Sequence, residues 1–151
     1  MTSRVNWLAA WAAMLLCCGS AAAGDQKLMH CFAWTAIPEA TQADWDAFFK
    51  ASDELPKKIK GIERVWYGKL VSPLSVAGLG QIDRETFQRY QGGETITTQV
   101  HRLQRQWGMC MEMKNESVLK AYEDDPYHKK WNDAYAKVRV EGTTTFNIVG
   151  Q

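Results

Sequence analysis

Tyr122 and His128 are six positions apart in the chain, and Pro126 lies between them. An imidazole can accept a proton near neutral pH, and a phenol can donate a hydrogen bond to an oxygen that gains negative charge. On an unbroken helix, six residues rotate the chain by about 240° net, so the two side chains would point to different faces. The pair can therefore act together only if the helix breaks between them.

Pro126 supplies such a break. Proline lacks a backbone N–H and keeps the residue before it out of the helical region. We therefore expect one helix to stop near Asp124 and another to begin with Asp125 as its N-cap and Pro126 at its first position. The restart would turn His128 toward the pocket that Tyr122 faces. The alternative is that Pro126 only bends the helix around the core and that His128 is a packing residue.

The rest of the chain predicts the elements that position this pair. Thr41 can cap a helix whose apolar stripe continues to Ile59, and Pro56 should end or kink it. Four short runs with alternating or β-branched residues predict strands at 28–34, 62–72, 107–113 and 142–150. The order predicts an α+β protein with the ferredoxin-like split βαβ arrangement, in which two helices cover one face of a four-stranded antiparallel sheet.

Residues 74–104 fit no single element. Four glycines punctuate the segment, its aliphatic residues fit a helix, and its threonines fit a strand. It has too few large apolar residues for a core of its own. We therefore expect an insertion that acts as a mobile flap or as an arm between two copies, not a second domain.

His30 is a further polar candidate, because it shares a strand face with Phe32 and Trp34. If that face meets the helices, His30 lines the same pocket as Tyr122 and His128. A hydrogen-bonded core histidine is the equal alternative.

Three features together resemble the Dabb family, the stress-responsive dimeric α+β barrel proteins. They are the histidine in "LMHCFAW", the stretch "VWYGK" at 65–69, and the Tyr122–Pro126–His128 spacing. The resemblance covers about residues 27–149, with 74–104 as an unusual insertion. It implies a homodimer whose two sheets face each other across a two-fold axis and form a barrel.

The plant polyketide cyclases of this family use a tyrosine and a histidine at the matching helix positions in an intramolecular aldol condensation. The resemblance therefore implies Tyr122 and His128 as a catalytic pair and puts Met109 near a pocket position. Methionine's fit to irregular gaps instead favours Met109, Met111 and Met113 as core residues. Two positions depart from the cyclases, because Met109 replaces a polar residue and Ser52 replaces a tyrosine. Both departures make the pocket more apolar or smaller, and they weaken the transfer of cyclase chemistry.

Two functions remain open from the sequence. In one, an exported dimer binds a small hydrophobic or aromatic ligand in each helix–sheet cleft. In the other, a lyase or cyclase uses His128 to remove a proton next to a carbonyl while Tyr122 stabilises the enolate. A haem-binding or oxygenase function is a weaker third, because no haem motif is present. No CxxC, HExxH or Walker motif occurs, so we predict no metal and no cofactor.

The first residues predict an export signal that is cut after Ala23, since Arg4 precedes an apolar run and small residues follow it. The run is shorter than the roughly 20 residues of a membrane span. Cys17 and Cys18 raise a lipoprotein alternative, which the residues before them disfavour. Loss of Arg4 leaves 17 basic residues (18 minus 1) against 17 acidic ones. We expect a periplasmic or secreted domain, 24–151, without nucleic-acid binding or stable membrane insertion.

Cys31 and Cys110 remain after this cleavage. Alternation places both on the face opposite His30 and Met109, in the two middle strands. They come within disulfide reach only if the strand register sets them directly opposite. Because a cross-strand bridge also needs unusual twist, we expect two buried thiols, despite the oxidising compartment that export implies.

Overall fold

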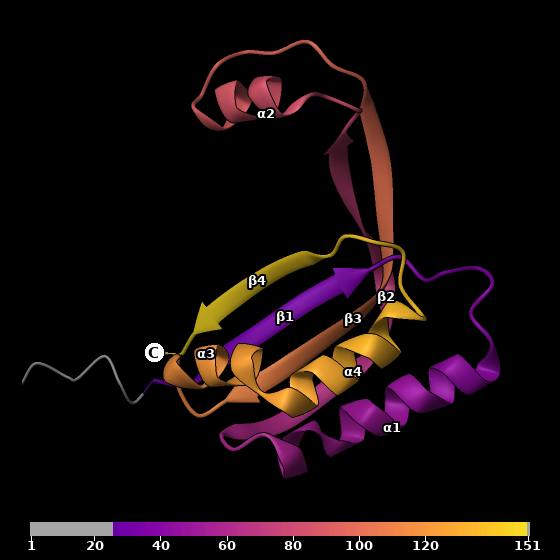
Figure 1. Ribbon diagram of the computed structural model, residues 1–151, viewed down its shortest axis with the longest axis vertical. Helices are drawn as coiled ribbons and strands as arrows, with labels where there is room; N and C mark the ends of the chain where they lie inside the picture. Colours follow the sequence, from indigo (N-terminus) through magenta and orange to yellow (C-terminus); the bar gives the residue numbers. More distant parts are fainter. Residues whose placement is uncertain (1–25, 151) are drawn as a thin grey trace, which may run out of the picture.

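The computed structural model describes residues 26–150 and shows a four-stranded antiparallel sheet with helices on one face (Figure 1). The predicted signal segment, 1–23, lies outside the described residues. In chain order, the elements are β1 (Leu28–Trp34), α1 (Gln42–Lys58), β2 (Ile62–Leu79), α2 (Arg84–Gln91), β3 (Val100–Met113), α3 (Ser117–Asp124), α4 (Pro126–Ala136) and β4 (Thr144–Val149). The order across the sheet is β2-β3-β1-β4, which confirms the predicted split βαβ topology with the first and third strands at the centre.

The helix-covered face of the sheet holds the hydrophobic core. Trp34 of β1 and Phe48 of α1 have no exposed surface, and their rings meet edge to face with centroids 5.6 Å apart. Phe32 packs in the same manner against Trp131 of α4, at 5.9 Å. Three methionines of β3 fill the space between these rings and the sheet, namely Met109, Met111 and Met113.

α1 begins and ends close to where the sequence predicts. The Thr41 side chain accepts a hydrogen bond from the backbone N–H of Asp44, and the Asp44 carboxylate accepts one from the N–H of Thr41. This reciprocal capping box satisfies two donors that a helix start leaves free. Pro56 lies in the last turn, and the helix stops at Lys58. The missing N–H of Pro56 weakens the final turn, so the helix cannot continue far beyond it.

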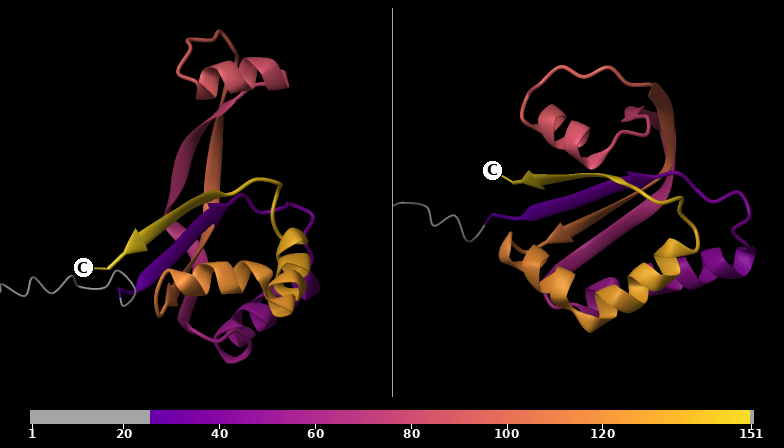
Figure 2. Two further views of the ribbon diagram at one scale, coloured as in Figure 1. Left: turned by 60° about the vertical axis from the view of Figure 1, so that its left-hand side comes forward. Right: turned by 45° about the horizontal axis from the view of Figure 1, so that its top comes forward.

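Residues 74–104 extend the β2–β3 pair beyond the sheet, and we call this segment the arm. Between Lys69 and Leu74, the register of β2 against β3 shifts because β2 contains extra residues there, Pro73 among them. Such a bulge bends a strand pair. The arm consequently leaves the sheet on the side away from α1 and α4 and carries α2 at its tip (Figures 1 and 2). No residue of α2 is buried.

The face of the sheet opposite the helices is open in the single chain, and we call it the open face. It carries large apolar side chains that keep about half of their surface exposed, namely Trp66, Phe146 and Ile148. Glu112 also lies on this face but is buried, because Lys27 and Arg64 both contact its carboxylate.

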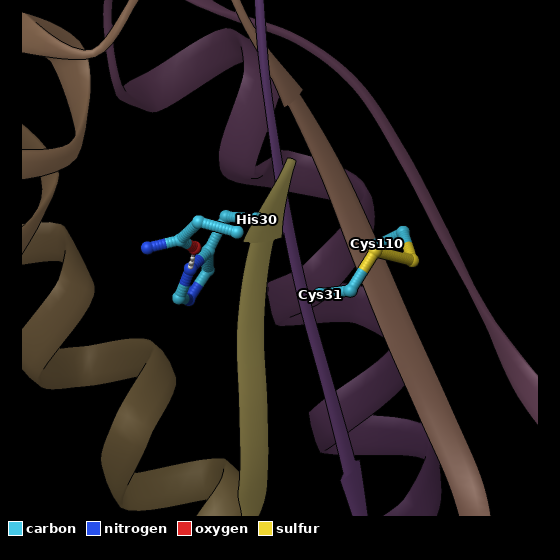
Figure 3. The surroundings of a disulfide bond; sticks show 4 residues. His30, Cys31 and Cys110 are labelled. Carbon is cyan, nitrogen blue, oxygen red and sulfur yellow. Dashed lines mark hydrogen bonds between the residues drawn. A yellow bond between two sulfur atoms is a disulfide. The ribbon is translucent and has the colours of Figure 1, made fainter. Parts of the chain in front are cut away.

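A disulfide joins Cys31 and Cys110 on the open face, so the expectation of two buried thiols is wrong (Figure 3). The register of β1 against β3 sets the two residues directly opposite each other, and their Cα atoms are 4.1 Å apart. In antiparallel pairs, the positions without mutual hydrogen bonds bring opposite Cα atoms to about 4.5 Å. The cysteines occupy such a close position, which the sequence alone does not reveal.

Candidate functional site

The break between α3 and α4 occurs where the sequence predicts it. Asp125 is extended, with ψ of 132°, and its carboxylate accepts a backbone N–H from the first turn of α4, which Pro126 opens. Tyr122 is buried in the last turn of α3. The restart brings the imidazole of His128 against the phenol ring of Tyr122, with centroids 4.1 Å apart. The predicted redirection of His128 toward Tyr122 is therefore confirmed.

His30 reaches the same region from β1. Its ring centroid lies 6.0 Å from that of Tyr122, and its Nδ1 donates a hydrogen bond to Oδ1 of Asn147 on β4 at 2.7 Å. His30 and the disulfide point to opposite sides of β1, as strand alternation requires (Figure 3). With Nδ1 held by Asn147, the Nε2 atom of His30 remains as an acceptor.

These three side chains line one cleft between the α3–α4 pair and the β1–β4 edge of the sheet, with a volume of about 200 Å³. Phe32 and Trp131 line the cleft beside them. Trp131 is held from behind, because its Nε1 donates to Oγ of Ser52 at 3.0 Å, and Ser52 donates to the carbonyl of Phe48. Ser52, which stands where the cyclases carry a tyrosine, thus positions an aromatic wall without entering the cleft.

The local electrostatics give Tyr122 and His128 complementary hydrogen-bonding roles. Burial raises the pKa of the Tyr122 hydroxyl above its ordinary value, and the nearby Glu123 carboxylate raises it further. The phenol therefore stays protonated at neutral pH and acts as a donor. Nδ1 of His128 lies 3.3 Å from the carbonyl oxygen of Glu123, which can only accept. In the neutral ring, Nδ1 therefore carries the hydrogen and Nε2 keeps a lone pair for a ligand.

Met109 is placed apart from the other candidate residues. It is 2% exposed and belongs to the core on β3, which β1 separates from the cleft-lining strand β4. The lining of the cleft includes His30, Tyr122 and His128 but not Met109. The structure thus brings three of the four sequence-derived candidates together.

Sequence reasoning missed the polar groups at the far end of the cleft. Tyr135 and Arg139 line this end, and the Arg139 guanidinium lies 4.7 Å above the Tyr135 ring. Arg105 of β3 approaches the same region and is 7% exposed. Alternation offered a signal for Arg105, because it shares a strand face with Trp107 and Met109. No comparable signal marks Arg139, which follows the end of α4.

Among residues 26–150, no three His, Cys, Asp or Glu side chains gather in a way that could hold a metal ion. The helices in this part of the chain are all too short or too polar to cross a bilayer.

No family model and no curated protein sequence matches the chain, but many solved structures do. A dimeric ferredoxin-like protein of unknown function from Bacteroides fragilis is 15% identical; the match covers 82% of this chain and 95% of that chain, with a TM-score of 0.51. A Dabb family protein with a ferredoxin-like fold from Mesorhizobium loti is 14% identical, with coverage of 83% and 98% and a TM-score of 0.52. The hydroxynitrile lyase from Passiflora edulis is 8% identical, with coverage of 84% and 95% and a TM-score of 0.55.

The chain is therefore an α+β protein of the ferredoxin-like class. The resemblance to the Dabb family is confirmed at the level of the fold, which the chain shares with a Dabb protein over most of its described length.

Proposed function

We propose that the protein is an exported homodimer that binds a small hydrophobic or aromatic ligand in the cleft between the α3–α4 pair and β1–β4. The observation that carries this proposal is the convergence of His30, Tyr122 and His128 on one cleft with aromatic walls. Mostly apolar pockets with a few convergent polar groups are the usual form of small-molecule sites. The volume of about 200 Å³ is below the roughly 300–1,000 Å³ of drug-sized sites, so it suits a ligand with a single ring.

The polar groups indicate how such a ligand would be oriented. The protonated hydroxyl of Tyr122 can donate to a ligand carbonyl, while the free Nε2 atoms of His128 and His30 can accept from a hydroxyl. A ring that carries a carbonyl or hydroxyl substituent satisfies both requirements. A pure hydrocarbon would offer these polar groups no hydrogen-bond partner.

A homodimer is supported by the open face and by the neighbouring structures. Trp66, Phe146 and Ile148 form an apolar surface that a second copy would cover. The structures from Bacteroides fragilis and Thermobifida fusca that share this fold are described as dimeric. The arm projects on the same side as the open face, and its tip exposes Phe87 and Tyr90. We therefore assign the arm to the contact between the two copies.

Export is supported by the Cys31–Cys110 disulfide, because such bonds persist in oxidising compartments outside the cytosol. Fractionation of cells that express the full chain tests this part of the proposal. We expect a periplasmic or secreted product that begins at residue 24. A full-length product in the cytosol would contradict export without bearing on the cleft.

Ligand binding is tested by titrating single-ring aromatic carbonyl and hydroxyl compounds into the protein while recording histidine and tryptophan NMR signals. We expect the signals of His30, His128 and Trp131 to shift together. Tyr122→Phe and His128→Ala should weaken binding about tenfold, as the loss of one buried hydrogen bond predicts, and leave the fold intact. His101→Ala is the matched control, because His101 lies in the arm. Binding that is insensitive to His128→Ala would refute this site.

A second candidate function, proton abstraction of the lyase or cyclase type, is favoured by the Tyr122–His128 pair. A protonated phenol beside an imidazole with a free Nε2 is suited to an enolate, because one group removes the proton and the other stabilises the oxyanion. Deuterium uptake at the α-carbon of an aryl ketone in D₂O would report this step without a complete reaction. Loss of the base should slow uptake about 10²–10⁴-fold in His128→Ala, whereas His101→Ala should not change it. Equal rates in both variants would exclude His128 as the base.

A further inference from the structure

Unpaired donors gather at the end of the cleft away from His30. Tyr135 is 4% exposed, and its hydroxyl is buried without a hydrogen-bond partner among residues 26–150. The Nε atom of Arg139, whose guanidinium covers the Tyr135 ring, is also buried and lacks a partner in this part of the chain. Buried polar groups in folded proteins are nearly always hydrogen-bonded. These donors therefore mark a site that the chain does not complete by itself.

A second arginine, on β3, approaches Gly142, next to the lining residue Thr143, but does not itself line the cleft. Arg105 is more than nine-tenths buried; its Nη1 donates to Oγ1 of Thr35 at 3.2 Å, and its Nε has no partner within the described chain. Burial raises the pKa of the Tyr135 hydroxyl, and the positive charges of Arg139 and Arg105 partly offset this rise.

Neither Arg105 nor Arg139 forms an ion pair with an acidic side chain anywhere in residues 26–150. A buried charge is unfavourable unless an opposite charge or several hydrogen bonds compensate it. On the open face, by contrast, the buried charge of Glu112 is compensated, because both Lys27 and Arg64 form ion pairs with its carboxylate. The acidic residue in the cleft lining, Glu123, follows Tyr122 in the chain and pairs with neither arginine.

We infer that this end of the cleft binds the carboxylate of an aromatic or hydrophobic acid through Arg139 and Tyr135, with Arg105 adding positive charge nearby without lining the cleft. A guanidinium has donors only and the Tyr135 hydroxyl can donate one hydrogen bond, whereas a carboxylate supplies the acceptors, with a planar shape that matches a guanidinium. The inference rests on the proposed binding function and specifies the class of ligand.

The dimensions of the cleft agree with one such molecule. His30 pairs with Asn147 of β4, and Thr143, which lines the arginine end, lies four residues away. Four strand residues span about 13 Å. A single ring with a carboxylate at one end and a hydroxyl or carbonyl at the other can bridge this span through hydrogen bonds at both ends. Phe32 and Trp131 would contact the ring between them.

The experiment compares single-ring carboxylates with their uncharged amides, for example 4-hydroxybenzoate with 4-hydroxybenzamide, by titration calorimetry on the purified protein. Because charge-assisted hydrogen bonds are about twice as strong as neutral ones, we expect the carboxylates to bind at least about tenfold more tightly. Arg139→Gln should abolish this preference, and Arg139→Lys should keep part of it. Arg84→Gln, on the exposed helix of the arm, is the control and should keep all of it.

The possible failures are distinguishable. Amides that bind as tightly as carboxylates, or a preference that survives in Arg139→Gln, would overturn this inference while leaving the cleft as a binding site. If neither series binds, the proposed function fails together with it. Thermal unfolding is a second measurement, because the carboxylate should raise the melting temperature of the wild type more than that of Arg139→Gln. Equal melting temperatures without ligand would confirm that the variant is folded.

Discussion

The two faces of the sheet use alternate residues of the same strands, yet a single chain completes only one of them. On the helix-covered face, Trp34 and Phe48 have no exposed surface, whereas Trp66 and Phe146 on the open face each keep 49% exposed. The open face lacks such packing, but the Cys31–Cys110 disulfide links β1 to β3 covalently there. One face is thus a complete hydrophobic core, and the other is the apolar surface that a second copy would cover in the proposed homodimer.

The faces also differ in how they treat charge. On the open face, the buried carboxylate of Glu112 has two basic partners. On the helix-covered face, Arg105 is buried and Arg139 half-buried, and neither has an acidic partner within residues 26–150. The helix-covered face therefore has a closed hydrophobic core but contains arginines whose charge no acidic side chain in this part of the chain compensates. The contrast distinguishes the proposed dimer surface, where exposed apolar side chains lack a partner, from the proposed ligand site, where buried donors lack an acceptor.

The largest expected difference between the faces is in stability. Phe48→Ala should lower the free energy of unfolding by about 3–5 kcal/mol, because it leaves a cavity in a closed core. Trp66→Ala, on the open face, should lower it by less than about 1 kcal/mol when the protein is measured as a monomer. Urea denaturation followed by circular dichroism checks both. Similar losses in the two variants would show that the open face already acts as a core in the single chain.

The disulfide should contribute the next largest effect. Replacing Cys31 and Cys110 together by Ala should lower the free energy of unfolding by about 2–4 kcal/mol, because the bond restricts the unfolded chain across 79 positions. Wild-type protein with a reductant should unfold at the same urea concentration as the variant. Thiol titration of the unfolded, unreduced protein without the predicted signal, residues 24–151, must find no free thiols, since Cys17 and Cys18 are then absent. Two thiols per chain would restore the expectation drawn from the sequence.

Features governed by local rules could be predicted from the sequence, and features governed by strand register could not. The Thr41 cap, the Asp125–Pro126 restart and the facing of His30 depend on residues that are neighbours along the chain. The disulfide depends on which residue of β3 faces Cys31, and a shift of one residue would have separated the sulfurs. The order of the elements in the sequence predicted the strand order but not this register.

The strands within the arm and the arginine end of the cleft could not be predicted, for a related reason. The strands of the arm show little hydrophobic alternation in the sequence. They are stabilised by pairing with each other across a long insertion and not by a buried face. Arg139 lies in the irregular segment after α4, where no periodicity predicts the direction of a side chain. Both features depend on contacts between residues far apart in sequence.

A new charge on the open face should weaken the proposed dimer, whereas a new charge on a surface outside the interface should not. Phe146→Asp would place an unpaired carboxylate between two copies, so we expect the dimer dissociation constant to rise by at least about tenfold. The unfolding of the monomer should hardly change, because Phe146 is half exposed in the single chain. Sedimentation equilibrium measures the association. Lys129→Asp, on the exposed side of α4, is the control, and equal effects of the two variants would place the interface elsewhere.

The smallest expected effect compares two helix caps with the same chemistry in different surroundings. Asp125 caps α4 beside the cleft, and Asp83 caps α2 in the arm; each carboxylate accepts a backbone N–H at 2.7 Å. Loss of an N-cap costs about 1 kcal/mol of helix stability. Asp125→Ala should show this loss in global unfolding because Trp131 ties α4 to the core, whereas Asp83→Ala should not, because α2 buries no residue.

The two caps should also differ in their effect on the site. Without its cap, the first turn of α4 frays, and His128 no longer holds its position 4.1 Å from the ring of Tyr122. The ring-current shift of the His128 protons should therefore move toward the value of an unstructured peptide in Asp125→Ala and stay unchanged in Asp83→Ala. An unchanged shift in both variants would mean that Pro126 alone fixes the restart. The Asp125 carboxylate would then stabilise α4 without positioning the imidazole.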